Sequence, residues 1–325
     1  MRRRAIIGLL GAAASAPPRA VTAQTGRAHR IGLLHGGAAV GDDTEDASAL
    51  IGAMARRGHV LGRNLSFERR AAMAHPERLP GFARELAAAK VDGVVTWGYP
   101  AALAAKEAGV PTVATGLGDP VATGLIRSLA RPGGTVTGIS DVVTDLSVKR
   151  LELVKEVVPR LRRVAMLWNK GDLGMTRRYE ASASVAERLG VGVQALGVQE
   201  PDDFGDAFAA MEREMPDAIL MVADPLTTLN RRRVFEFAAR HRLAAIYEFD
   251  ALVRDGGLMS YGTDRGEVFE RAAALLDHIL RGDSPADLAF ELPTRFRFAV
   301  NLRTARAIGL EFPPATLARA DEVIE

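Results

Sequence analysis

The sequence contains no cysteine, and this absence excludes several kinds of chemistry. A chain without thiols forms no disulfide, holds no metal through sulfur and uses no cysteine nucleophile. It also carries no lipidated cysteine behind a cleaved leader. The six histidines are scattered, without the spacing typical of metal ligands, so we expect no metal site.

The signatures of several large enzyme classes are also missing. No G-x-G-x-x-G follows the first strand-like segment, and Gly36-Gly37 does not supply this pattern. The chain has no P-loop, no G-x-S-x-G turn and no H-E-x-x-H pair. We therefore expect no cofactor.

The N-terminal residues 1–23 are predicted to be a cleaved export signal. Arg2 to Arg4 precede a short apolar run from Ala5 to Ala16, and Val21 to Ala23 offers small residues for cleavage. The paired arginines also allow the twin-arginine export route beside the general one. The alternative is an uncleaved membrane anchor, but the apolar run is too short to span a bilayer. Without a second apolar span or a lipid anchor, we expect the exported chain to be free in a periplasm.

The charge of the chain depends on this segment. It holds four arginines and no acidic residue, so its removal lowers the net charge from +2 to −2. No strongly basic stripe remains, and nucleic acid is not an expected partner. The cluster from Arg231 to Arg233 is interpreted as the solvated face of a helix. Residues 24–325 are too many for most single hydrophobic cores and indicate two lobes.

Strand-like and helix-like segments alternate along the whole chain, as in the buried run from Ile31 to His35 and the helical stretch from Ala47 to Arg57. This alternation implies parallel sheets with right-handed crossovers. We predict an α/β fold of two Rossmann-like lobes joined by a three-strand hinge. Lobe 1 comprises residues 29–139 and 262–289, and lobe 2 comprises residues 140–261 and 290–325.

A glycine-rich stretch from Gly116 to Ser140 follows the strand-like run Val110 to Ala114 and holds six glycines. Such a segment is typical of a loop at the carboxyl edge of a parallel sheet, where open α/β folds bind ligands. Asp119 could pair with an amino group of a ligand, or it could cap a helix that begins at Pro120. The alternative is a plain surface loop.

A second candidate lies one strand earlier, at Gly98-Tyr99-Pro100-Ala101. This segment joins the end of a strand to the start of a helix, where unpaired N–H groups and a partial positive charge favour a carboxylate. Tyr99 could add a ring or hydroxyl contact. The alternative is an ordinary helix that starts with proline.

Polar residues also end three strands of the second lobe. Asn169, Asp224 and Glu248 could together form a wall opposite the glycine-rich loop, although such residues also start helices. Asp119 with Asp224 or Glu248 could alternatively act as a carboxylate pair across a cleft, as in glycosidases.

Three further residues complete the candidate set. His35 ends the first strand and is either a cleft residue or an ordinary loop histidine. Ser140 falls where the chain crosses between lobes and could be a hinge residue or a hydroxyl donor. Tyr261 ends a crossover strand and could be an aromatic platform for ligand or part of the core.

From end to end, these residues resemble the bacterial ABC-transporter substrate-binding proteins of the TrpX type, a branch of the type I periplasmic binding fold. The longest matching motif is Gly118-Asp119-Pro120-Val121 with Ala130-Arg131-Pro132-Gly133-Gly134. Further matching pieces are residues 1–4 with 9–11, 58–64, 76–80, 149–153, 224–226, 256–262 and 313–325.

The resemblance implies two α/β lobes that close on a small molecule and deliver it to a membrane permease and its ATPase. Ligands of this family include aromatic amino acids. The chain departs from the family pattern at Tyr99, where a small hydroxyl residue is common.

We therefore expect a monomeric periplasmic solute-binding protein without catalytic activity, whose ligand is a small organic molecule with a carboxylate. The helix start at Gly98 to Ala101 would hold the carboxylate, and Tyr99 and Tyr261 would cover the apolar part. The polar groups of the ligand would be bound by Asp119, Asn169, Asp224 and Glu248. The alternatives are a secreted enzyme that uses the cleft carboxylates and a ligand sensor for a separate receptor.

Overall fold

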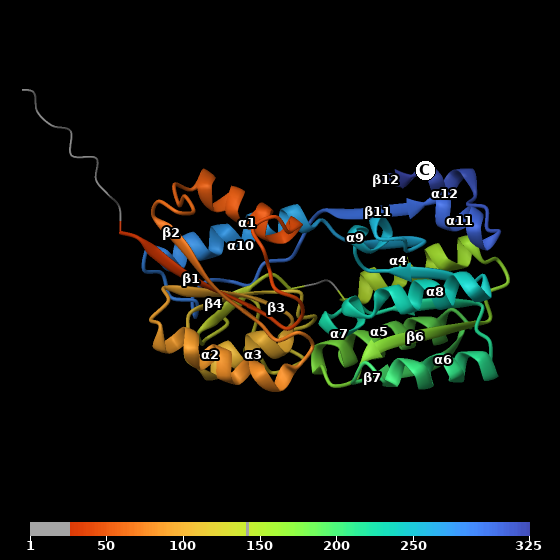
Figure 1. The fold of residues 1–325 in the computed structure, drawn as a ribbon, viewed down its shortest axis with the longest axis horizontal. Coiled ribbons are helices and arrows are strands. Elements are labelled where there is room, and N and C mark those ends of the chain that lie inside the picture. Colours follow the sequence, from red (N-terminus) through yellow and green to blue (C-terminus); the bar gives the residue numbers. More distant parts are fainter. Residues whose placement is uncertain (1–26, 141–142) are drawn as a thin grey trace, which may run out of the picture.

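The computed structural model describes residues 27–140 and 143–325, and the predicted export signal lies outside these residues. Two lobes lie side by side, each with one β-sheet between layers of helices (Figure 1). The two-lobe α/β fold predicted from the alternation of strands and helices is confirmed. In the described part of the chain, no helix combines the length and apolar character needed to cross a bilayer.

The first lobe contains a five-stranded parallel sheet in the order β2-β1-β3-β4-β5. Its strands are β1 (His29–His35), β2 (Leu65–Ala71), β3 (Gly93–Trp97), β4 (Thr112–Thr115) and β5 (Val136–Gly138). Its helices are α1 (Glu45–Arg56), the 3-10 turn η1 (Pro76–Arg78), α2 (Leu79–Ala88), α3 (Tyr99–Glu107) and α10 (Arg265–Leu280). The apolar sides of α1 and α10 pack on one face of the sheet, and those of α2 and α3 pack on the other.

The second lobe contains a seven-stranded sheet in the order β12-β11-β10-β9-β8-β6-β7. Its strands are β6 (Arg163–Asn169), β7 (Gly192–Val198), β8 (Ala218–Met221), β9 (Ala244–Tyr247), β10 (Met259–Thr263), β11 (Phe296–Asn301) and β12 (Glu322–Ile324). Its longer helices are α4 (Val143–Val157), α5 (Leu173–Arg188), α6 (Asp203–Arg213) and α8 (Arg231–His241). Its shorter helices are α7 (Pro225–Leu229), α9 (Asp250–Arg254), α11 (Leu302–Ile308) and α12 (Pro314–Leu317).

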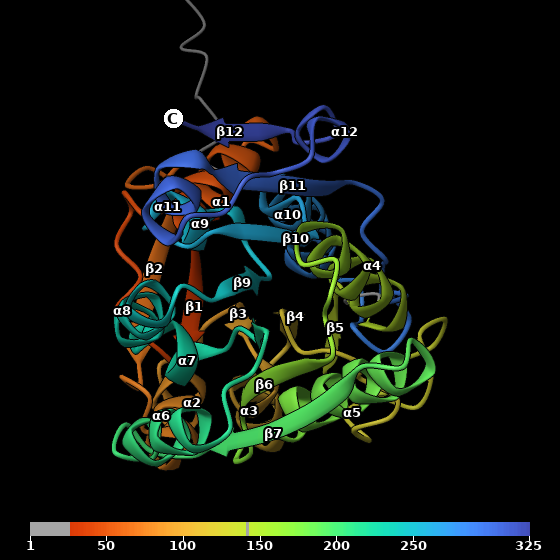
Figure 2. The same ribbon diagram turned by 90° about the vertical axis from the view of Figure 1, so that its right-hand side faces the viewer.

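This second sheet, which Figure 2 views from the side of the second lobe, is not wholly parallel. β10 and β11 pair antiparallel, with Thr263 opposite Phe296. The chain enters β11 from the connection between the lobes rather than from a crossover helix, so β11 starts at the edge where β10 ends. The prediction of purely parallel sheets is therefore wrong for this pair.

The connections between the two sheets are hydrogen-bonded to one another. Ser140 N donates to Glu291 O, and Glu291 N donates to Gly138 O, each at 2.9 Å. Asp264 N, just after β10, donates to Arg295 O at 3.0 Å. These bonds join the segment after β5, the segment after β10 and the segment before β11, so the lobes are linked by a narrow bundle of extended chain.

The glycine-rich stretch after β4 differs from its prediction in one respect. No helix begins at Pro120, because the chain runs instead through a series of turns. The Asp119 Oδ1 atom accepts the N–H groups of Val121 and Ala122, at 2.9 and 3.0 Å. Gly124 then has a φ of 73°, a left-handed conformation that ends any helical turn.

Candidate ligand-binding cleft

A cavity with a volume of about 320 Å³ lies between the two lobes at the predicted site. Its first-lobe wall is formed at the carboxyl ends of β1, β3 and β4, by residues that include His35, Trp97, Gly98 and Gly116. Its second-lobe wall is formed after β6, β8 and β9, by residues that include Asp172, Asp224 and Phe249. The cavity therefore occupies the edge at which open α/β sheets bind ligands.

A smaller cavity of about 80 Å³ adjoins the first. The two share Trp97, Asp172, Asp224 and Pro225 as lining residues. The smaller cavity is further lined by Pro100, Ala101, Asn169 and Gln199. Asp172 and Asp224 therefore lie where the two cavities meet, opposite the start of α3.

Gly98 brings the start of α3 to this junction. The residue has a φ of 87°, so β3 turns directly into α3 without an intervening loop. No side chain caps this helix start, and Pro100 occupies its first turn, where a missing N–H costs nothing. The positive end of the helix dipole thus borders both cavities through Gly98, Pro100 and Ala101.

Asp172 and Asp224 are buried carboxyl groups on the second-lobe wall. Asp172 is 1 % exposed and caps α5 by accepting the N–H of Met175 at 3.2 Å. Burial, together with the nearby charge of Asp224, raises the pKa of Asp172 to about 7. Asp224 caps α7 through Thr227 N at 2.8 Å and accepts Asn169 Nδ2 at 2.6 Å, and burial also raises its pKa.

The part of the larger cavity around Trp97 and Phe249 is aromatic. Trp97 Nε1 donates to Asp46 Oδ2 at 2.9 Å, and Arg265 Nε donates to Asp46 Oδ1 at 2.7 Å. The Arg265 guanidinium also lies 4.6 Å from the centre of the Phe249 ring, which belongs to the opposite lobe. Because Arg265 neutralises Asp46, this part presents rings without a net charge.

His35 lies beside this aromatic part. Its ring centre is 5.5 Å from that of Trp97, and its Nδ1 atom accepts the N–H of Gly37 at 2.8 Å. Burial lowers the pKa of His35 to about 4, so the imidazole is neutral at physiological pH. With Nδ1 acting as an acceptor, the proton of the neutral ring resides on Nε2, which is left as the donor.

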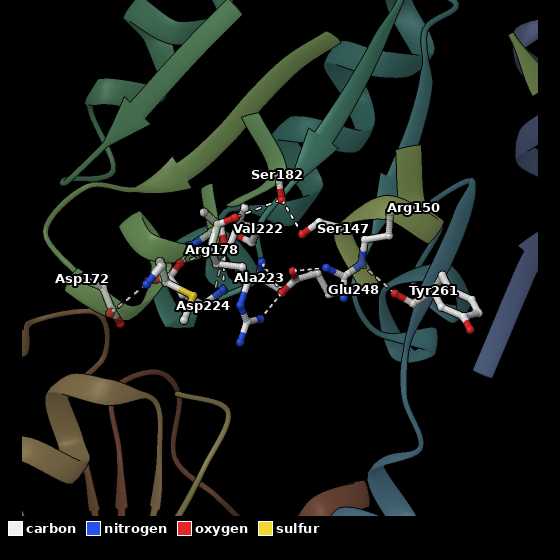
Figure 3. A network of polar contacts seen from close by, with 12 residues as sticks. Ser147, Arg150, Asp172, Arg178, Ser182, Val222, Ala223, Asp224, Glu248 and Tyr261 are labelled. Carbon is white, nitrogen blue, oxygen red and sulfur yellow. Dashed lines mark hydrogen bonds and ion pairs between the residues drawn. The ribbon is translucent and has the colours of Figure 1, made fainter. Parts of the chain in front are cut away.

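Glu248 is held within the second lobe, as Figure 3 shows. Its Oε1 accepts Arg150 Nη1 at 2.7 Å, and its Oε2 accepts Arg178 Nη1 at 2.5 Å and Ala223 N at 3.1 Å. Burial alone would raise the pKa of Glu248, but the two guanidiniums outweigh it and lower that pKa. Both carboxylate oxygens are therefore engaged within the lobe.

The structure places four more of the predicted residues away from the lining of these two cavities. Tyr99 is half-buried beside Gly174 and packs against the group around Leu117. Asp119 accepts N–H groups of its own turn, and the buried Ser140 donates from Oγ to Gly118 O at 3.2 Å. Tyr261 stacks on Phe296 with ring centres 6.3 Å apart.

Of the predicted residues, the structure gathers His35, Gly98, Pro100, Asn169 and Asp224 at the cavities. The sequence reasoning did not select Trp97, Asp172, Phe249 or Arg265. Trp97 is the last residue of the strand that leads to Gly98, and Asp172 stands in the N-cap position shortly after another strand. Their positions next to strand ends are the sequence signal by which Trp97 and Asp172 could have been selected.

The lobes are in contact around the cavity. A Cβ placed on Gly36 would lie 2.9 Å from Pro225 Cγ of the opposite lobe. Arg254 of α9 pairs with Glu45 of α1 at 2.8 Å, which is an ion pair between the lobes. The described residues contain no group of three or more side chains that could hold a metal ion.

Comparisons with known proteins agree with this architecture. Residues 43–324 match the family described as ABC transporter substrate binding protein. A tyrosine-binding protein of Clostridioides difficile is 24% identical over 264 residues, which cover 80% of this chain and 75% of that protein.

Two solved structures are similar over 91% of this chain and the whole of theirs. A conserved domain protein from Vibrio cholerae has a TM-score of 0.85 at 23% identity. An ABC domain from Streptococcus pneumoniae, solved in complex with L-Trp, has a TM-score of 0.83 at 21% identity. The resemblance to substrate-binding proteins of the TrpX type and the type I periplasmic binding fold are thus confirmed.

Proteins of this family bind small molecules and work with an ABC permease and its ATPase, and they are solute-binding proteins rather than enzymes. They are typically exported. The match covers most of the chain, which therefore belongs to the ABC transporter substrate-binding protein family.

Proposed function

We propose that this protein is the solute-binding component of an ABC importer and closes its lobes on an aromatic amino acid. The observation that carries this proposal is the inter-lobe cavity of about 320 Å³, with Trp97, Phe249 and His35 in its lining. Its volume falls at the small end of the range of ligand sites, about 300–1,000 Å³. A ligand with one or two rings fits such a space, and aromatic pairs add about 0.5–1.5 kcal/mol beyond their buried area.

The start of α3 suits the carboxylate of the same ligand. The dipole of this helix favours an anion at its start, and a partly buried contact of this kind contributes about 2 kcal/mol. The relatives support an amino-acid ligand, because one is named a tyrosine-binding protein and another was solved with L-Trp.

The family match supports the import role, and the remaining parts of the proposal extend it. The protein acts as a monomer in the periplasm after removal of residues 1–23, and it hands its ligand to an ABC permease and ATPase in the inner membrane. It performs no catalysis, so turnover of a bound ligand would contradict the proposal and favour a secreted enzyme.

The two tryptophans of the chain provide a direct test. Trp97 lines the cavity, whereas Trp168 stacks on Tyr179 inside the second lobe, with ring centres 3.6 Å apart. In a Trp168→Phe variant, we expect L-phenylalanine and L-tyrosine to change the fluorescence of Trp97. In the matched Trp97→Phe variant, the remaining signal from Trp168 is expected to stay constant.

Calorimetric titration of the unmodified protein completes this test. We expect saturable binding of L-tryptophan, L-tyrosine or L-phenylalanine and none of simple sugars. Binding of a sugar in place of every aromatic amino acid would overturn the proposal.

A further inference from the structure

We infer that the first lobe carries a second ligand site, which binds a phosphate group between the end of α3 and the glycine-rich stretch. This site is separate from the cleft between the lobes and does not depend on the proposed function. The phosphate group can belong to a free phosphate ester or to the headgroup of a lipid, and binding to vesicles distinguishes these two sources.

The site is a cavity of about 250 Å³ on the first lobe. It is lined by Lys106 of α3 and by residues 124–127 and 132–136 of the glycine-rich stretch. None of these residues lines either of the two cavities of the cleft. The glycine-rich stretch contributes only Gly116 to the lining of the cleft, so most of this motif has no part in the ligand site between the lobes.

The second cavity and the cleft lie at opposite ends of α3. Pro100 borders the cleft in the first turn of this helix, whereas Lys106 lies in its last turn. At 1.5 Å per residue, these two residues are about 9 Å apart along the helix axis. A group bound beside Lys106 is therefore out of reach of the helix start.

The first support for an anion is the charge of the cavity. Two cations line it, Lys106 and Arg127, and no acidic residue does. The Arg127 guanidinium forms no hydrogen bond or ion pair with any described residue. The cavity therefore presents positive charge that the described chain does not neutralise.

Lys106 also has a structural role, but that role leaves part of its hydrogen-bonding capacity unused. Its Nζ atom donates to Leu125 O at 2.7 Å and to Gly124 O at 3.4 Å. A cation in the last turn also suits the negative end of the helix dipole. Because an ammonium has three donors, one remains for a ligand. These contacts explain Lys106 but do not explain Arg127.

The second support is a set of donors without an acceptor. Thr135 lines the cavity, and its Oγ1 atom is buried without a hydrogen-bond partner among the described residues. The backbone N–H groups of Gly134 and Thr135 also donate to no acceptor in the described part of the chain. Buried polar groups of native proteins are nearly always hydrogen-bonded, so an unpaired hydroxyl beside a cavity indicates a ligand that accepts from it.

Glycine keeps one wall of the cavity open. Gly133 has a φ of 73°, a left-handed conformation that other residues rarely adopt. A Cβ on the next residue, Gly134, would meet no atom within 4 Å. The backbone of Gly134 is therefore open to close approach by a ligand oxygen.

A phosphate group suits this combination of donors. A phosphate monoester carries about −1.5 to −2 charges at pH 7 and three strong acceptor oxygens. Arginine binds phosphate through parallel N–H bonds, and lysine binds it as a point charge. The cavity is smaller than the sites of drug-sized ligands, which occupy about 300–1,000 Å³, so it suits a compact anion.

Single substitutions test each group of the site. Lys106→Gln and Arg127→Gln remove the charges, and Thr135→Val removes the hydroxyl group at a similar volume. The control for Lys106 is Lys155→Gln on the second lobe, because Lys155 Nζ also donates to a carbonyl at a helix end, at 3.4 Å. The control for Arg127 is Arg213→Gln, at an exposed position in the last turn of α6.

Calorimetric titration with inorganic phosphate and with glycerol 3-phosphate measures binding of the free anion. We expect saturable binding at one site per chain, weakened by added salt. The Kd is expected to rise at least tenfold in Lys106→Gln and Arg127→Gln and at least about threefold in Thr135→Val. It is expected to stay within about twofold in Lys155→Gln and Arg213→Gln. Circular dichroism and thermal unfolding establish that each variant is folded.

Flotation with vesicles distinguishes the two sources of the phosphate group. Vesicles of phosphatidylglycerol carry a net negative charge, whereas vesicles of phosphatidylcholine carry none. Selective binding to phosphatidylglycerol that Lys106→Gln and Arg127→Gln remove and the two controls retain would assign the phosphate group to a lipid. Binding of the soluble probes alone, with the same dependence on the variants, would assign it to a free ester.

Three results would overturn the second site. The first is the absence of binding to both soluble probes and to phosphatidylglycerol vesicles. The second is an equal loss of binding in the variants and in their controls, which would indicate a nonspecific charge effect. The third is phosphate binding that Lys106→Gln and Arg127→Gln leave unchanged, because an anion held at the start of α3 in the cleft would give this result.

Discussion

Gly174, near the start of α5, lies so close to Leu117 of the other lobe that a Cβ on Gly174 would be 2.6 Å from the Leu117 carbonyl oxygen. Only glycine allows the two lobes to approach to this extent. Asp172 immediately precedes α5, so the approach that brings Gly174 to Leu117 also brings Asp172 to the cavity. The close approach of the lobes at Gly174 therefore also positions Asp172 at the cavity.

Gly174→Ala is expected to lower ligand affinity by at least tenfold, because the added methyl group holds the lobes apart. The same change favours helix formation by up to about 1 kcal/mol, so the unliganded protein is not destabilised. Calorimetric titration and thermal unfolding measure the two effects. The control is Gly205→Ala in α6, where an added Cβ meets no atom within 4 Å. Equal affinities of the two variants would show that Gly174 does not control closure.

Asp172 is expected to make the unliganded protein less stable as the pH rises. Its pKa is about 7 in the folded protein and about 3.9 in an unfolded chain, so the folded state binds the proton more tightly. The stability that this proton provides is complete below about pH 4 and is lost as the pH rises to about 7. One proton changes the free energy of unfolding by at most about 1.4 kcal/mol per pH unit.

Asp172→Asn removes this dependence while keeping the helix cap. We expect the variant to gain stability relative to the unmodified protein from pH 4 to pH 7, with no further gain above pH 8. Denaturant unfolding at pH 4.5, 6 and 8 measures the difference in the free energy of unfolding between the two proteins. Other titrating groups contribute equally to both. A difference in stability that does not change with pH would contradict the raised pKa of Asp172.

Glu248 is expected to support the fold rather than to bind ligand. Glu248→Gln leaves the buried guanidiniums of Arg150 and Arg178 facing a neutral amide, and breaking a buried ion pair costs about 3–5 kcal/mol. Denaturant unfolding measures this loss, and titration of the folded variant is expected to show retained affinity. Glu180→Gln, in an exposed pair with Arg177, serves as the control and costs less than about 1 kcal/mol. A large loss of affinity in stable Glu248→Gln would place Glu248 in the site.

The fold was largely predictable because its strands are buried in parallel sheets and appear as short apolar runs. The predicted strand 31–35 lies within β1 (His29–His35), and the predicted helix 47–57 overlaps α1 (Glu45–Arg56). The antiparallel direction of β11 was not predictable in this way. The direction of β11 depends on where the chain re-enters the sheet. The sequence pattern within Phe296–Asn301 carries no information about this point of entry.

The sequence predicted where the site lies, at the carboxyl edge of the sheets, but not which side chains line it. Glu248 and Asp224 both follow strands. The charge of Glu248 is neutralised by two arginines, whereas Asp224 forms no ion pair among the described residues. The difference comes from Arg150, which is 98 residues from Glu248 in the sequence, and from Arg178, which is 70 residues away. Pairings over such separations arise from packing and cannot be read from local spacing.

Asp119 is the remaining case in which the sequence left two roles open. The structure has its carboxylate accepting the N–H groups of Val121 and Ala122, at the start of a turn. Asp119→Ala is expected to lower the free energy of unfolding by about 1 kcal/mol, because the turn loses its hydrogen bonds to the Asp119 carboxylate, and to leave ligand affinity unchanged. Asp119→Asn, which retains an accepting side-chain oxygen, is expected to restore most of that stability. A tenfold loss of affinity in both variants would instead mean that the carboxylate binds ligand, because asparagine keeps the accepting oxygen but removes the charge.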